Sequence, residues 1–78
     1  RYYKKIISTI LSEGIIGDYI EEIQKKFPSL EIGSYPYFKK NSFGVSLVVK
    51  GVDDEIVLKA TSEIHAYISS INGNPEIY

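Results

Sequence analysis

The spacing of the apolar residues changes twice along this 78-residue chain, and these changes constrain its fold more than any other feature. Between residues 16 and 27, apolar side chains recur every three or four positions, as in a helix with one buried face. In residues 43–50, apolar side chains from Phe43 onward alternate with other side chains, as in a strand with one covered face. Residues 57–71 return to the helical spacing. Together these periods predict helices packed against one side of a sheet.

Other segments complete the prediction. Residues 2–11 are rich in aromatic and β-branched side chains, which favour a first strand. Residues 30–38 begin to alternate before Gly33 and Pro36 interrupt the pattern, which indicates an irregular or edge strand. The first helix is expected to run to about Lys26 and to stop at Pro28.

The second helix has recognisable ends. Asp53 precedes it as a plausible N-cap, and Asn72-Gly73 terminates it. Residues 76–78 are expected to begin a fourth strand. The predicted order is therefore β-α-β-β-α(-β), an α+β fold with two helices on one face of a three- or four-stranded sheet, of ferredoxin-like or KH-like type.

Size and composition limit what the chain can do. With 78 residues it can build one core, and we expect residues 1–78 to be a single small domain from a longer polypeptide. The net charge of −1 provides no general attraction for RNA or DNA. The absence of cysteine excludes disulfides and thiolate metal sites. No apolar run approaches the length of a membrane span, and we expect a cytoplasmic location.

Two motifs allow a functional and a structural interpretation. Residues 14–17 form a Gly-x-x-Gly run, which in KH domains clamps a nucleic-acid backbone. The two isoleucines between the glycines and the acids that follow them favour instead a turn that caps the first helix. An aromatic cluster surrounds Lys39 and Lys40, and its rings could stack on bases or simply flank a solvated turn. The aromatic residues are Tyr35, Tyr37, Phe38 and Phe43.

Catalytic chemistry has little support in the sequence. His65 is the only histidine, and no second ligand at suitable spacing indicates a metal site. Asp53 and Asp54 are explained by helix capping, and Ser34 has no recognisable base. We therefore predict no catalytic residue, no metal and no cofactor in this domain.

A family resemblance rests on two segments. Residues 28–37 contain the run Gly-Ser-Tyr-Pro at 33–36, and residues 43–54 contain a strand, a glycine turn and an acidic helix start. Both are similar to segments of CinA-type competence/damage-inducible proteins and of the molybdopterin-binding-like region of FAD synthases. The resemblance covers roughly residues 14–71 and implies a KH-like region downstream of a MoaB-like domain.

The resemblance implies an accessory role. The family's nucleotide chemistry, described as pyrophosphate-bond hydrolysis in CinA-type proteins, would belong to the upstream MoaB-like domain of the same polypeptide. This chain would then orient domains or assist formation of a homodimer, and the alternative is a KH-like nucleic-acid-binding module that uses the Gly14–Gly17 turn. The candidate contact residues for a partner or ligand are Gly33, Ser34, Tyr35, Pro36, Tyr37, Lys39 and Lys40.

Overall fold

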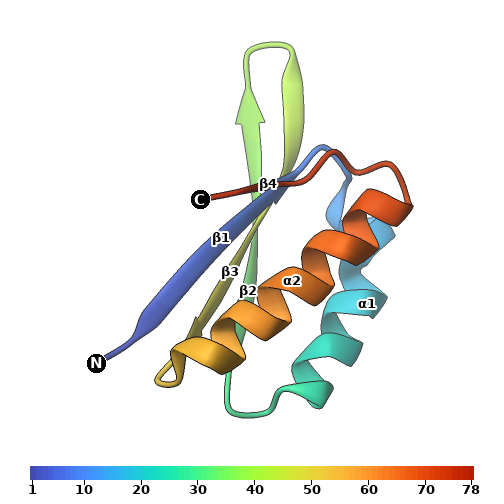
Figure 1. The fold of residues 1–78 in the computed structure, drawn as a ribbon. Coiled ribbons are helices and arrows are strands. Elements are labelled where there is room, and N and C mark those ends of the chain that lie inside the picture. The colour runs from blue at the N-terminus through green and yellow to red at the C-terminus, as the bar shows by residue number, and fades with distance from the viewer.

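Six elements follow one another in the order β-α-β-β-α-β in the computed structural model, which describes residues 1–78 (Figure 1). The order confirms the prediction, including the fourth strand, while the first strand is shorter than the predicted residues 2–11. The strands are β1 (Tyr3–Thr9), β2 (Glu31–Lys39), β3 (Ser42–Gly51) and β4 (Glu76–Ile77), and the helices are α1 (Glu13–Lys26) and α2 (Asp54–Ser70).

The four strands form one antiparallel sheet in the order β2-β3-β1-β4. The strands that α1 connects, β1 and β2, have β3 between them, and those that α2 connects, β3 and β4, have β1 between them. Each helix therefore crosses over one intervening strand, which is the split βαβ arrangement of ferredoxin-like folds. The predicted edge strand, β2, does lie at an edge, and it pairs with β3 without interruption from Glu31 to Lys39.

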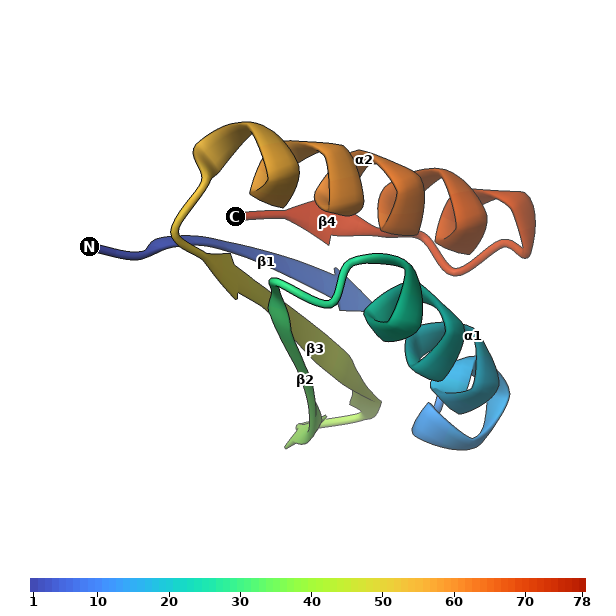
Figure 2. The same ribbon diagram turned by 90° about the horizontal axis from the view of Figure 1, so that it is seen from below.

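Both helices pack on the same face of the sheet and leave the opposite face uncovered (Figure 2). The side chains between the two layers form one apolar core, since antiparallel strands place every second residue on the same face. Neither helix has the length and apolar character required to cross a membrane. The buried core residues are Ile7, Ile16, Ile23, Phe27, Leu30, Val45, Leu47, Val49, Val57, Ala60, Ile64 and Ile68.

The turn predicted at residues 14–17 is wrong, because Gly14 and Gly17 lie within α1. The backbone of Ser12 is extended, with φ −79° and ψ 159°, and the helix starts directly after it at Glu13. Glycine disfavours a helix by about 1 kcal/mol relative to alanine, but Ile16 is fully buried in this first part of the helix. Burial of that side chain favours the helical backbone over an open turn.

Both ends of α2 match the predicted signals. The carboxylate of Asp53 accepts hydrogen bonds from the backbone N–H groups of Glu55 at 3.0 Å and Ile56 at 3.4 Å, which confirms it as the N-cap. At the other end, the N–H of Gly73 donates to the carbonyl of Ile68 at 2.8 Å. The hydroxyl of Thr9 at the end of β1 donates to the carbonyl of Gly73 at 2.7 Å, so this turn is also tied to the sheet.

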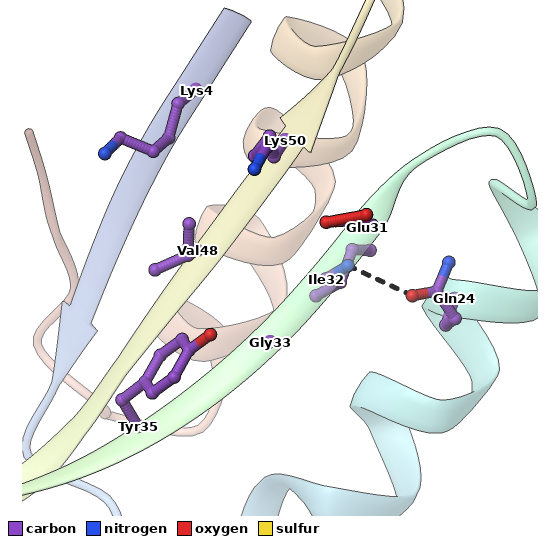
Figure 3. Close-up of a pocket in the computed structure, with 8 residues that line it drawn as sticks. All are labelled: Lys4, Gln24, Glu31, Ile32, Gly33, Tyr35, Val48 and Lys50. Carbon is purple, nitrogen blue, oxygen red and sulfur yellow. Dashed lines mark hydrogen bonds between the residues drawn. The ribbon is translucent and has the colours of Figure 1, made fainter. Parts of the chain in front are cut away.

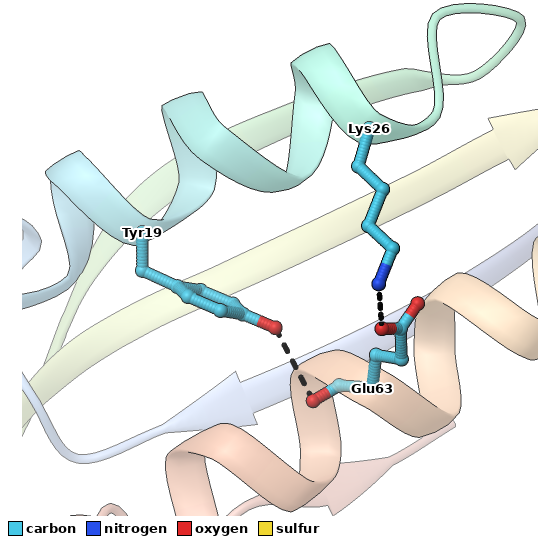
Figure 4. Close-up of polar contacts among 3 residues, drawn as sticks. All are labelled: Tyr19, Lys26 and Glu63. Atoms are coloured by element: carbon cyan, nitrogen blue, oxygen red, sulfur yellow. Dashed lines mark hydrogen bonds and ion pairs between the residues drawn. The ribbon is translucent and has the colours of Figure 1, made fainter.

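A small polar network joins α1 to α2 (Figure 4). The hydroxyl of Tyr19 donates to the carbonyl of Glu63 at 3.3 Å, and the ammonium group of Lys26 lies 2.5 Å from the Glu63 carboxylate. The ring of Tyr19 stacks on that of Tyr67, with centroids 3.8 Å apart. Burial, with a smaller effect from the negative charge of Glu63, raises the pKa of the Tyr19 hydroxyl above its ordinary value.

Candidate functional site

The predicted contact segment lies along β2, where strand geometry divides it between two surfaces. Ser34 pairs with Leu47, a buried residue, so Ser34 and Pro36 lie on the side of the sheet that carries the helices. Tyr35 pairs with Ser46 on the opposite, uncovered face. Gly33, Tyr37 and Lys39 share that face with Tyr35, because side chains alternate along a strand, and Lys40 lies in the following turn. The candidate residues therefore do not form one site.

Two tyrosines of the uncovered face lie against glycines. A Cβ atom on Gly33 would lie 3.1 Å from the hydroxyl of Tyr35, so the ring occupies the space beside this glycine (Figure 3). A Cβ atom on Gly44 would lie 2.7 Å from the hydroxyl of Tyr37, which also donates to the carbonyl of Thr9 at 3.4 Å. The missing side chains leave room for both rings, and 60% of Tyr35 remains exposed.

The uncovered face combines aromatic rings, aliphatic side chains and lysines. Ile6 pairs with Val48 across its centre, and both are partly exposed. A hollow of about 490 Å³ lies beside Lys4, Lys50 and Tyr35 (Figure 3). The single salt bridge of the chain is that between α1 and α2, so neither Lys4 nor Lys50 has a carboxylate partner. Such a face can bind another surface or a ligand.

The turn between β2 and β3 carries an exposed aromatic pair. Phe38 pairs with Phe43 across the two strands, with ring centroids 6.1 Å apart, and their exposed fractions are 90% and 56%. Lys39 and Lys40 lie beside them, and this end of the hairpin extends beyond both helices (Figure 1). These four residues are called the hairpin tip below.

The exposure of Phe43 differs from the prediction, which placed it on the buried face of its strand. The alternation itself is correct, because Val45, Leu47 and Val49 are buried. However, β1 pairs with β3 only as far as Thr9 and Val45, so Phe43 lies past the end of the neighbouring strand. A periodic pattern indicates the side of a strand but not how far the covering layer extends.

A groove runs between α1 and the outer edge of β2. Its volume is about 540 Å³, and its apolar lining comes from Ile16, Ile20 and Ile32. Charged side chains also line it, two acidic and one basic, and Gly17 forms part of its wall. This α1–β2 groove was not predicted, because it depends on how closely the helix approaches the strand. Its charged residues are Glu13, Glu21 and Lys25.

Polar side chains along the groove hold the strand to the helix. The amide of Gln24 accepts from the N–H of Ile32 at 3.0 Å and donates to the carbonyls of Leu30 at 2.7 Å and Phe27 at 3.2 Å. The Ser34 hydroxyl donates to the carboxylate of Glu13. These contacts give Ser34 a structural role. The sequence carries no signal for the role of Gln24, since a glutamine seven residues before a strand follows no recognised motif.

The arrangement does not assemble a metal centre. No group of three or more histidine, aspartate and glutamate side chains is close enough to hold an ion, and His65 lies partly buried on α2. What the structure offers is three surfaces for contact: the uncovered face, the hairpin tip and the α1–β2 groove.

Comparison with known proteins gives the family. The family model described as "FAD synthase, middle domain" matches residues 1–73 of the chain. The chain belongs to this family. A search of curated proteins gives no match. Among solved structures, the de novo designed protein Foldit4 is similar, with a TM-score of 0.69 and 16% sequence identity over 99% of this chain and 90% of that one.

These findings bear on the resemblance in different ways. The FAD synthase part is supported by the family match, while the relation to CinA-type proteins and the MoaB-like neighbour remain predictions. The likeness to a designed protein shows the fold alone. A designed sequence can adopt the same architecture, so the fold by itself does not indicate a function. The function depends on which residues the fold exposes.

Proposed function

We propose that this chain is a non-catalytic accessory domain that holds the neighbouring domains of an FAD synthase in their working orientation. The uncovered face of the sheet supports this role most directly. Its centre is aliphatic and its rings are tyrosines, which bury apolar area while keeping a hydroxyl for hydrogen bonds and are enriched at protein interfaces. Lys4 and Lys50 form no salt bridge and outnumber the one acidic residue of the same hollow, Glu31, so they suit a neighbour whose contact surface carries carboxylates.

The finer part of the proposal concerns that neighbour. The resemblance of the segment at 33–36 supports a MoaB-like domain upstream as part of this proposal, with the nucleotide site on that domain and none on this one. A relation to CinA-type proteins and a cytoplasmic location belong to the same proposal. In this arrangement Tyr35 acts through an interface and touches no substrate.

The test compares one variant in two settings. Tyr35→Ala should change the unfolding free energy of the 78-residue chain by no more than about 0.5 kcal/mol, because the ring is mostly exposed. In the full-length FAD synthase it should lower FAD formation and speed cleavage between domains by a protease. Val52→Ala is the matched control, since Val52 is 66% exposed in the loop before α2. Full-length activity and cleavage unchanged by Tyr35→Ala would contradict the proposal.

The alternative role, a KH-like nucleic-acid-binding module, has less support. Gly14 and Gly17 lie inside α1 rather than in a loop, and acidic residues follow at Asp18, Glu21 and Glu22. We expect single-stranded oligonucleotides to bind no more tightly than about 10⁻⁴ M at physiological salt. Micromolar binding that Gly17→Asp abolishes would favour the alternative, and a fluorescence titration measures both.

A further inference from the structure

The hairpin tip and the α1–β2 groove are complementary in shape and charge. The tip projects beyond both helices (Figure 1), with the two phenylalanines on one side, Lys39 on the other and Lys40 in the turn. The groove is concave and apolar at its base, and it carries more acidic than basic side chains. Protein interfaces often have an aromatic side chain in an apolar pocket at their centre. Side chains of opposite charge commonly face each other around that centre.

Gly17 leaves the helix wall of the groove open. Glycine within a helix lowers its stability, and it is normally explained by a close internal contact. Here no atom of the chain lies within 4 Å of the position that a Cβ atom would occupy. The fold therefore does not require a glycine at this position. A small residue in the wall of an apolar groove does widen the groove for an incoming side chain.

Strand addition is an unsuitable way to fill this groove. The N–H of Ile32 points away from β3 and is bonded to Gln24, so the residues that alternate with it, Ser34, Pro36 and Phe38, have the same outward orientation. Pro36 has no N–H to donate at this edge. Of the four outward positions, one has its N–H already bonded and one has no N–H, so an added strand would pair poorly with β2. A partner therefore has to bind through side chains.

The tip cannot reach the groove of its own chain. It is the continuation of β2, the strand that forms one wall of the groove, and β2 stays in register with β3 from Glu31↔Lys50 to Lys39↔Ser42. Folding the tip back would break this ladder. The tip of a second copy is free of this restriction and carries suitable charge.

We propose that two copies of this chain form a dimer in which the hairpin tip of each copy docks into the α1–β2 groove of the other. Phe38 packs against Ile20 and Ile32 of the second copy, which are the partly exposed isoleucines of the groove. Lys40 then lies beside the acidic side chain at 21. A reciprocal exchange closes the assembly at two copies, since both tips and both grooves are used.

The first experiment measures association of the 78-residue chain by sedimentation velocity over a concentration series. Phe38→Ser and Gly17→Leu should each raise the dimer dissociation constant at least about tenfold, the first by removing the anchor and the second by filling the groove. Leu58→Ser is the matched control, because Leu58 is exposed on α2 and remote from both surfaces in sequence. Circular dichroism checks that each variant is folded.

Charge exchange separates a specific dimer from general apolar association. Lys40→Glu and Glu21→Lys should each weaken the dimer, because each variant alone brings like charges together at both contacts. Mixing the two variants should restore association, since both tip–groove contacts of the mixed dimer then join opposite charges. A chain that is monomeric throughout the series overturns the proposal. A dimer that is unchanged by both Phe38→Ser and Gly17→Leu also overturns it, because its interface then lies elsewhere.

Site-specific cross-linking identifies the occupant. The chain contains no cysteine, so Lys40→Cys and Glu21→Cys each introduce a single thiol. An equimolar mixture should form the disulfide-linked heterodimer in preference to either homodimer, and a mixture of Lys40→Cys with Leu58→Cys should not. In the full-length protein, a cross-link from residue 40 to another domain instead of to residue 21 of a second copy would assign the tip to that domain and overturn the proposal.

Discussion

The two faces of the sheet are built from the same strands, but the helices cover only one of them. On the helix-covered face, Leu47 and Val49 of β3 are completely buried. On the uncovered face, Val48 from the same strand lies between lysines and tyrosines and remains partly exposed. The comparison shows that stability depends mainly on one side of each strand, so the other side is free to carry residues for contact.

The largest expected difference between the faces comes from a buried charge. Ile64→Asp places an unpaired carboxylate at a position with 0% exposure, and the cost of several kcal/mol is comparable with the whole stability of a small domain. The chain should be unfolded at 25 °C by circular dichroism. Leu58→Asp, on the exposed side of the same helix, should stay folded. A folded Ile64→Asp chain would mean that the covered face does not determine stability.

Adjacent residues of β3 give a sharper test. Leu47→Ala should lower the unfolding free energy by about 2–5 kcal/mol, because the lost side chain leaves a cavity in the core. Val48→Ala should cost less than about 1 kcal/mol, since Val48 lies on the solvent side. Urea denaturation of both variants measures the two values. Equal losses would show that another layer covers the second face in solution, as dimerisation through that face would produce.

The smallest effect concerns the helical layer at high pH. Because the pKa of Tyr19 is raised in the folded chain above its ordinary value of 10.0, the unfolded chain loses this proton first as the pH rises. The contribution of the protonated Tyr19 hydroxyl to the unfolding free energy is complete below pH 10, and it is lost as the pH rises towards the folded-state pKa. Tyr19→Phe should therefore show a shallower fall in unfolding free energy above pH 10, while at neutral pH it loses about 0.5–1.5 kcal/mol with its hydrogen bond to Glu63. Identical slopes for the two chains would show that Tyr19 does not contribute to alkaline unfolding.

Hydrophobic periodicity was sufficient to predict most of the fold. The helical spacing at 57–71 and the capping signal of Asp53 located α2, and the alternation at 43–50 located the buried side of β3. These predictions succeed because each depends on neighbours within a few positions in sequence. The order of all six elements followed from the same reasoning.

The functional surfaces were much less predictable. The candidate residues at 33–40 are adjacent in sequence but alternate between two faces, and the groove depends on residues from α1 that no motif marks. The Gly-x-x-Gly pattern indicated a turn, but burial of Ile16 favours a helix there. In each case the outcome depends on contacts between distant segments, which local patterns do not specify.

The hydrogen bond between Thr9 and Gly73 has a consequence for how the chain folds, because it spans 64 positions in sequence. The first strand to be synthesised lies at the centre of the sheet, and its partners β3 and β4 come after it in the chain. Closing such long loops makes folding slower than in a helical bundle of similar size. During translation β1 stays unpaired until β3 has emerged, and its second edge stays open until β4 follows at residues 76–77.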